Sequence, residues 1–122
     1  MANAGSTVAQ VTALGNVQGT GAYTTLSDAT SKENVADLAE GALERINSLR
    51  PVTFDYIGGE SNQTGFVAQE VETVIPEAVT DFGDGLKGLR DGAILANLVK
   101  AVQELSEKVT ALEAEVAQLK AA

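Results

Sequence analysis

The residues that could do chemistry in this chain are few, because it contains neither histidine nor cysteine. That composition excludes a Ser-His-Asp triad, a cysteine nucleophile and a thiolate zinc site. We expect no metal and no cofactor. A serine hydroxyl needs a base to take its proton, and the nearest candidate base for Ser27 is Lys32. Spacing alone does not separate this pair from a serine that shapes a turn and a solvated surface lysine.

Lysine is a base only after it loses its proton, which burial or a neighbouring cation favours. Asp28 and Glu33 lie close to the pair in sequence and favour the charged form instead. Burial by surrounding structure must therefore dominate if Lys32 is to activate Ser27.

The element around which the rest of the chain is organised is the C-terminal stretch 95–119. Its apolar residues alternate at spacings of 3 and 4, which is the heptad pattern of a left-handed coiled coil. A lone helix cannot bury such a stripe, so the sequence predicts an oligomer; the alternative is a single amphipathic helix lying on its own domain. The seam consists of Leu95, Leu98, Val102, Leu105, Val109, Leu112, Val116 and Leu119.

Charges beside the seam favour a parallel arrangement. In an in-register bundle, Lys108 faces Glu113 and Glu115 faces Lys120 of the neighbouring helix. Each such exposed pair contributes only about 0.2–1 kcal/mol, but together the pairs can select orientation.

The number of helices in the bundle is left open by periodicity. Valine at the first core position with leucine at the second favours two strands. The apolar residues Ile94, Val99 and Ala101 widen the face, which suits three strands or a helix base that docks on a head.

Composition limits the partners. The 122 residues carry a formal net charge of −9 with no cluster of basic residues, so we expect no nucleic-acid partner. No apolar run approaches the roughly 20 residues that span a bilayer, so we expect no membrane segment. The head alone is small enough that its core gains from association.

The segment 1–26 is Gly- and Thr-rich, and we interpret it as extended, strand-like chain, the alternative being a disordered leader. Thr30 and Glu33 form a capping box for a predicted helix over Val35–Leu49, whose regular part can begin as late as Ala39 because Gly41 weakens its middle. Pro51 ends it.

Further short elements follow in alternation. The hydrophobic pattern predicts four strands, over Val52–Ile57, Thr64–Ala68, Ala78–Phe82 and Leu86–Leu89. It also predicts a short helix over Gln69–Ile75 and a three-residue turn at Gly83-Asp84-Gly85. A long helix is predicted over Ala93–Leu119, capped by Asp91. Phe54, Tyr56 and Phe66 should form the apolar centre of the head.

Three blocks of sequence carry a family resemblance. They are Ser27-Asp28 with Lys32-Glu33-Asn34-Val35, then Leu49-Arg50-Pro51-Val52-Thr53-Phe54-Asp55-Tyr56, then Gly65-Phe66-Val67-Ala68-Gln69-Glu70-Val71 with Ile75-Pro76-Glu77. In this order, before a coiled-coil helix, they resemble the C-terminal intramolecular chaperone domain of phage tailspikes and tail fibres, the self-cleaving peptidase family S74 of the endosialidase type. The likeness covers residues 27 to about 112.

The resemblance implies a homotrimer that templates the upstream fibre or tailspike segment of the same polypeptide and then cuts itself off. The Ser/Lys pair of the family maps onto Ser27 and Lys32, and the cut falls between Leu26 and Ser27. Asp28 and Gln69 are candidate supporting groups. The implied location is a virion tail-fibre precursor assembled in the host cytoplasm.

We therefore expect an α+β fold: an upstream fibre stub over 1–26, a chaperone head of helices and short antiparallel hairpins over 27–90, and a helix over 91–122 forming a parallel trimeric coiled coil. The alternative to a single-turnover autopeptidase is a non-cleaving trimerisation cap. A third interpretation is a coiled-coil adaptor that binds proteins through its acidic surface.

Overall fold

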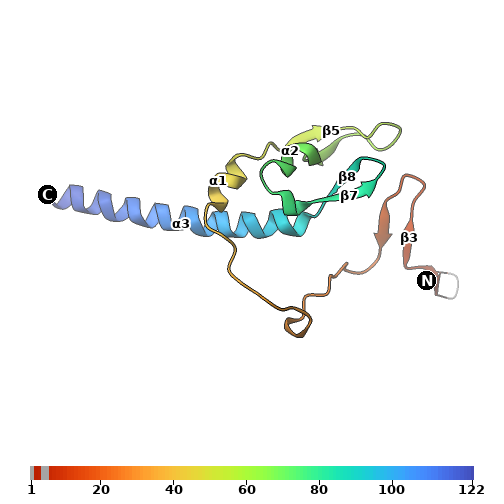
Figure 1. Ribbon diagram of the computed structural model, residues 1–122, viewed down its shortest axis with the longest axis horizontal. Coiled ribbons are helices and arrows are strands. Elements are labelled where there is room, and N and C mark those ends of the chain that lie inside the picture. Colours follow the sequence, from red (N-terminus) through yellow and green to blue (C-terminus); the bar gives the residue numbers. More distant parts are fainter. Residues whose placement is uncertain (1, 4–5) are drawn as a thin grey trace. The chain divides into compact units, whose positions relative to one another are not determined.

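The computed structural model describes residues 2–3 and 6–122 (Figure 1). Met1, Ala4 and Gly5, which belong to the predicted stub, lie outside the described residues. The chain forms two compact units. The first comprises the described residues up to Ala36 together with Asp55–Ser61, and the second comprises Asp37–Phe54 and Asn62–Ala122.

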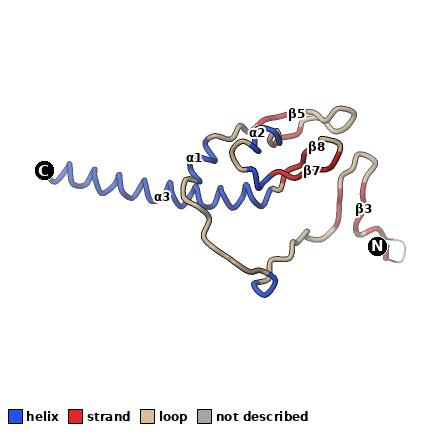
Figure 2. The backbone as a smooth tube through the Cα atoms, in the orientation of Figure 1, coloured by secondary structure: helices blue, strands red, loops and turns tan. Residues whose placement is uncertain are grey.

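The first unit consists mainly of hairpins and loop. Strand β1 (Ala2–Asn3) pairs antiparallel with β2 (Ser6–Thr7), and β3 (Ala9–Val11) pairs antiparallel with β4 (Val17–Gly19). The described part of the segment 1–26 thus contains four short strands. Beyond β4 the chain is loop, interrupted by one 3-10 turn, η1 (Ala29–Ser31), drawn as a short blue segment in Figure 2.

Two predictions for the segment before Pro51 are wrong. The capping box of Thr30 and Glu33 does not form, because η1 is a single turn capped by Asp28. The helix begins only at Ala42: α1 spans Ala42–Asn47, after Gly41 at φ 94°. That left-handed backbone cannot continue a right-handed helix, so glycine separates the loop from the helix.

The second unit holds the remaining elements. Its strands form two antiparallel hairpins, β5 (Val52–Phe54) with β6 (Gln63–Gly65) and β7 (Val79–Gly83) with β8 (Leu86–Leu89). Between the hairpins lie α2 (Ala68–Glu72) and the 3-10 turn η2 (Pro76–Ala78), and the chain ends in α3 (Asp91–Ala121). Apart from η2, these are the predicted elements, although β5, β6 and α2 are shorter than expected.

The β7–β8 turn contains two residues rather than three. Gly83 pairs with Leu86, which leaves Asp84 and Gly85 at the tip with φ 52° and 76°. Two positive φ angles are what a type I′ hairpin turn needs. Asp91 was predicted to cap the long helix, but it is the first residue of α3. Arg90 occupies the cap position before it.

The apolar core is aliphatic, which corrects the prediction of an aromatic centre. Val71, Ile75, Ala78 and Ile94 form the buried cluster, and Phe66 packs against it only partly buried. Tyr56 is 59% exposed and lies outside the three paired residues of β5. The hairpin is too short to carry all three aromatics into the core.

Helix α3 presents two different faces. Ile94, Asn97 and Ala101 are buried, and α1 lies against this part of the helix (Figure 1). All eight seam residues, from Leu95 to Leu119, remain between 45% and 77% exposed. The docking face and the heptad seam are therefore separate stripes on one helix. Within the described part of the chain, no helix is long and apolar enough to cross a membrane.

Candidate functional site

The structure brings Ser27 and Lys32 together. The Lys32 Nζ atom donates a hydrogen bond to the Ser27 Oγ atom at 2.7 Å. Five residues of extended chain would hold these groups far apart, so the contact depends on the turn between them.

That turn is η1, and Asp28 starts it. The Asp28 carboxylate accepts from the backbone N–H of Thr30 at 2.9 Å and also from the Thr30 hydroxyl. The backbone N–H of Lys32 donates to the Ala29 carbonyl at 3.2 Å, which closes the turn. An aspartate before a turn satisfies N–H groups that the turn itself leaves unpaired.

These hydrogen bonds also set the charge of Asp28. The Thr30 hydroxyl, and after it the Thr30 backbone N–H, hold the pKa of the Asp28 carboxyl below its ordinary value. Asp28 is therefore ionised at neutral pH, and its carboxylate is occupied by Thr30. Its role in the geometry is to shape the turn that carries Lys32 over Ser27.

The peptide bond expected to be cut is accessible. Leu26 is 77% exposed, and the side chains of Ser27 and Lys32 are exposed as well. In a single chain the pair is thus a preformed contact in water. Gln69 lies on α2 in the second unit with an exposed side chain, and its supporting role stays a prediction.

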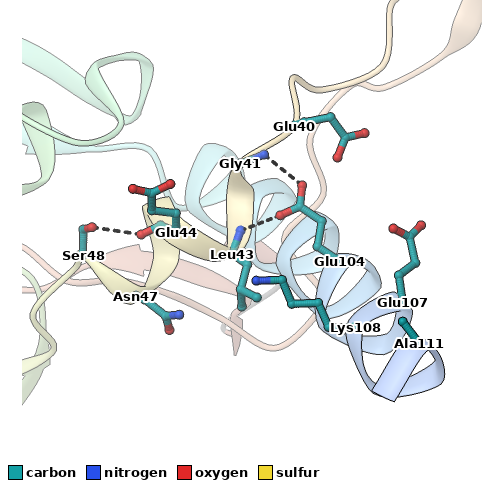
Figure 3. Close-up of a pocket in the computed structure, with 10 residues that line it drawn as sticks. All are labelled: Glu40, Gly41, Leu43, Glu44, Asn47, Ser48, Glu104, Glu107, Lys108 and Ala111. Carbon is teal, nitrogen blue, oxygen red and sulfur yellow. Dashed lines mark hydrogen bonds between the residues drawn. The ribbon is translucent and has the colours of Figure 1, made fainter. Parts of the chain in front are cut away.

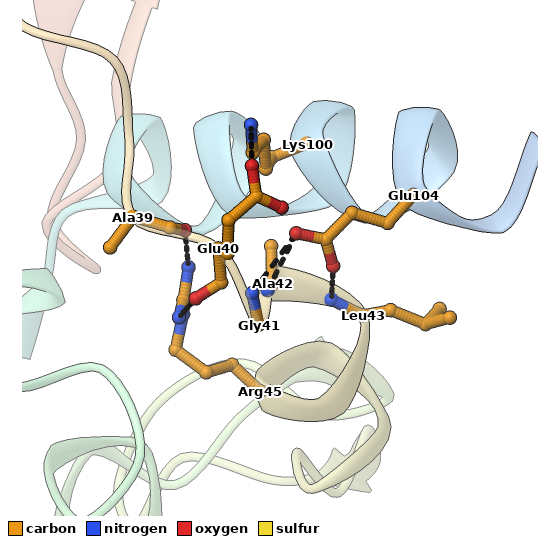
Figure 4. A network of polar contacts seen from close by, with 8 residues as sticks. All are labelled: Ala39, Glu40, Gly41, Ala42, Leu43, Arg45, Lys100 and Glu104. Atoms are coloured by element: carbon orange, nitrogen blue, oxygen red, sulfur yellow. Dashed lines mark hydrogen bonds and ion pairs between the residues drawn. The ribbon is translucent and has the colours of Figure 1, made fainter. Parts of the chain in front are cut away.

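A second polar centre, absent from the sequence predictions, joins α1 to α3. The Glu104 carboxylate accepts from the backbone N–H groups of Gly41 at 3.0 Å, Ala42 at 3.3 Å and Leu43 at 2.8 Å (Figure 4). The first N–H groups of a helix have no partner within it, and α1 has no cap from its own side chains. Glu104 of α3 supplies that cap from outside.

The charge of Glu104 follows from these contacts. The backbone N–H of Leu43, with smaller contributions from Gly41 and Ala42, holds the pKa of the Glu104 carboxyl below its ordinary value. A carboxylate at a helix N-terminus is also favoured by the helix dipole. Glu104 thus docks α1 in its ionised form.

Arg45 makes the second link between α1 and α3. Its Nε donates to the Oδ1 of buried Asn97 at 2.8 Å, and its two terminal nitrogens donate to the carbonyls of Ala39 and Glu40 at 2.9 and 3.0 Å. The Asn97 amide donates in turn to the Ala93 carbonyl at 2.9 Å. The carbonyls of Ala39 and Glu40 are used by Arg45, which fixes the loop entering α1.

One sequence signal could have identified this centre. Ile94, Asn97, Ala101 and Glu104 repeat the same 3-4-3 spacing as the heptad seam, on a neighbouring stripe of the helix. A polar residue at two of four positions on an otherwise apolar stripe indicates a specific docking partner rather than a second seam.

An open groove of about 750 Å³ lies beside this junction (Figure 3). Of the ten described residues that line it, four are glutamates, and Lys108 is the one of opposite charge. In the described part of the chain no group of three or more acidic, histidine or cysteine residues could hold a metal ion. The groove is lined by Glu40, Gly41, Leu43, Glu44, Asn47, Ser48, Glu104, Glu107, Lys108 and Ala111.

Comparison with known proteins identifies relatives. Residues 27–80 match the Peptidase_S74 family model, described as the chaperone of endosialidase. The chain is 32% identical over 96 residues to the long tail fiber protein Gp37 of Enterobacteria phage M1, covering 71% of this chain and 38% of that protein. Gp37 of Enterobacteria phage K3 is 37% identical over 99 residues, covering 74% of this chain and 8% of that protein.

A more distant relative comes from an animal. Myelin regulatory factor homolog 1 of Caenorhabditis elegans is 29% identical over 119 residues, covering 88% of this chain and 13% of that protein. The chain spans 38% of the length of the M1 fibre protein and less of the other two. The shared part is thus a module of longer proteins.

Proposed function

Because residues 27–80 belong to the chaperone-of-endosialidase family, we propose that this chain is an intramolecular chaperone for a phage tail fibre or tailspike. Three copies associate and bring the upstream fibre segments of the same polypeptides together to fold. The chaperone then separates from the fibre by cutting its own Leu26–Ser27 bond. The precursor assembles in the host cytoplasm and the fibre joins the virion tail.

The heptad seam supports the assembly step. Eight half-exposed apolar side chains lie along α3, while the face that carries Ile94 and Ala101 is already covered by the head. The seam therefore remains for partner helices. A parallel bundle of three helices buries it and places the three chains in register.

The observation that carries the cleavage step is the 2.7 Å contact between Lys32 Nζ and Ser27 Oγ. This distance suits proton transfer in either direction. With Lys32 neutral, Nζ takes the hydroxyl proton as Ser27 Oγ attacks the Leu26 carbonyl carbon.

The remaining steps conserve atoms and charge. The C–N bond between Leu26 and Ser27 breaks, the ammonium returns its proton to the leaving nitrogen, and the Leu26 acyl group is held as an ester on Ser27 Oγ. Water then attacks the ester carbon, which releases the Leu26 carboxylate and restores the Ser27 hydroxyl. The two products are a fibre that ends at Leu26 and a chaperone that begins at Ser27.

Exposure of the pair couples cutting to folding. In a single chain the Lys32 side chain is exposed to solvent. Trimer formation that covers the turn removes water and favours the neutral amine. The bond is thus cut only after assembly.

The same exposure favours a second candidate, a trimerisation cap with this fold that never cuts. A chain carrying a long natural upstream segment, run on a denaturing gel, separates the two. Autoproteolysis gives two fragments for the wild type and one uncut band for Ser27→Ala and Lys32→Ala, both still trimeric. An uncut wild type favours the cap, and normal cutting of either variant removes the Ser/Lys mechanism.

A further inference from the structure

One side-chain hydrogen bond spans the proposed cleavage point. The Asn16 Nδ2 atom donates to the Glu60 Oε1 atom at 2.7 Å. Asn16 lies before the Leu26–Ser27 bond and Glu60 lies after it, in the loop that connects β5 to β6. Both residues belong to the first compact unit, in which Asp55–Ser61 is grouped with the N-terminal segment.

In residues 7–37 and in the loop 55–61, burial is confined to the surroundings of this contact. Within residues 7–37 only Thr12 and Asn16 are half-buried, and every other residue there is exposed. In the loop 55–61 the one half-buried residue is Glu60. On both sides of the cleavage point, the residues that are shielded from solvent are thus those in or beside the hydrogen bond.

Each partner is held by a tight turn. On the fibre side, Thr12 Oγ1 accepts from the Asn16 backbone N–H at 3.0 Å, and the Thr12 N–H donates to the Asn16 carbonyl at 2.8 Å. On the other side, the Tyr56 N–H donates to the Glu60 carbonyl at 2.8 Å, over a turn with Gly58 at φ 72°. Two fixed backbones meeting through one side-chain pair lose little entropy when the contact forms.

From this geometry we infer that the β5–β6 loop is a latch that retains the fibre-side hairpin β3–β4 after the Leu26–Ser27 bond is cut. The inference rests on the proposed function for its biological meaning. Cutting the backbone converts the Asn16–Glu60 contact from an intramolecular into an intermolecular one. Its acceptor is a carboxylate, and hydrogen bonds to charged groups are stronger than neutral ones.

Assembly strengthens the latch. In a trimer, three Asn16–Glu60 contacts hold one trimeric fibre end. When one contact breaks, the other two stay in place, so the broken contact can re-form within the same complex. Backbone cleavage and physical release then become separate events, and release requires that the loop 55–61 let go of the hairpin.

The test uses a cut that does not depend on Ser27. In a Ser27→Ala chain, residues 21–25, which are exposed, are replaced by the recognition sequence of a site-specific protease. A cysteine added at the N-terminus carries a fluorophore, because the chain has no cysteine of its own. After cutting by the added protease, dilution and size-exclusion chromatography measure how long the labelled fragment stays with the rest of the chain.

We expect slow release from the parent and release at least about tenfold faster from Glu60→Ala and from Asn16→Ala, because each substitution removes all three contacts of the trimer. The double variant should release no faster than either single one, since both remove the same contact. Glu77→Ala, which removes an exposed glutamate elsewhere, should behave as the parent. Release of the parent fragment within the mixing time, or equal release from parent and Glu60→Ala, would overturn the latch. Self-cutting of the unmodified Ser27 chain, scored separately on a denaturing gel, reports on the proposed function alone.

Discussion

At the scale of single residues, the proposed cleavage depends on the direction of one hydrogen bond. As long as Lys32 is charged, it donates to Ser27 and holds the hydroxyl without activating it. When Lys32 is neutral, the same distance lets the hydroxyl donate instead. The contact that the proposed cleavage needs is therefore already present in the single chain, and in this proposal the protonation state of Lys32 decides whether the reaction proceeds.

Lys32→Arg separates charge from basicity. Arginine keeps the positive charge and can still donate to Ser27, but its guanidinium does not give up its proton. We expect the cleavage rate to fall at least about 100-fold, the lower range of general-base contributions. Gel densitometry over time on a chain with an upstream segment measures it; cutting at the wild-type rate would show that Lys32 is not the base.

The sequence was enough to predict that Ser27 and Lys32 pair, but it did not predict the environment of this pair. Ser27 and Lys32 are five positions apart, so a local turn is enough to join them. The function of Asp28 was harder to anticipate, because its carboxylate is taken by Thr30 rather than by the lysine. Which donor the Asp28 carboxylate binds depends on the geometry of the turn, and residue spacing does not define that geometry.

At the scale of elements, the docking of α1 on α3 depends on ionised Glu104. Its pKa is lower in the folded chain than in the unfolded chain, so it stabilises the docked helix above its ordinary pKa. This contribution disappears as the pH falls through the depressed folded value. The stability of the second unit should therefore decrease with acid in that range.

Glu104→Gln should remove this pH dependence. The amide oxygen can still accept from the α1 N–H groups but carries no charge, so the variant should melt below the wild type at pH 7 and approach it in acid. Circular dichroism melts across pH check this. Glu107→Gln, at an exposed position three residues further along α3, is the matched control. Equal pH slopes for Glu104→Gln and Glu107→Gln would contradict the cap.

The aliphatic core gives a direct comparison of two isoleucines. Ile75 is fully buried in the core and Ile57 is fully exposed. Ile75→Ala should lower the free energy of unfolding by about 2–5 kcal/mol, whereas Ile57→Ala should change it by no more than about 0.5 kcal/mol. Urea titration followed by circular dichroism measures both; similar losses would place the core elsewhere.

The elements themselves show where sequence patterns succeed. The long helix and β8 are close to prediction because a regular 3-4 spacing and the Gly-Asp-Gly sequence before β8 are local signals. The helix over Val35–Leu49 was overestimated because Gly41 needs a left-handed backbone there. Glu104 was missed since its partners are more than 60 residues away in sequence.

At the scale of the whole molecule, we expect the seam of α3 to hold three chains together. Leu105→Asp would bury an unpaired charge in every copy and should dissociate the assembly. Gln103→Asp places the same charge on an exposed position of the same helix and should leave it intact. Sedimentation equilibrium at micromolar concentration distinguishes them, and equal masses for the two variants would argue against the seam as the interface.

Native mass spectrometry of the chain joined to an upstream fibre segment reports on assembly and cutting in one sample. We expect a trimeric complex whose chaperone subunits begin at Ser27 in the wild type and remain uncut in Ser27→Ala. A monomeric or dimeric wild type, or a trimer whose subunits are cut at another bond, would contradict it.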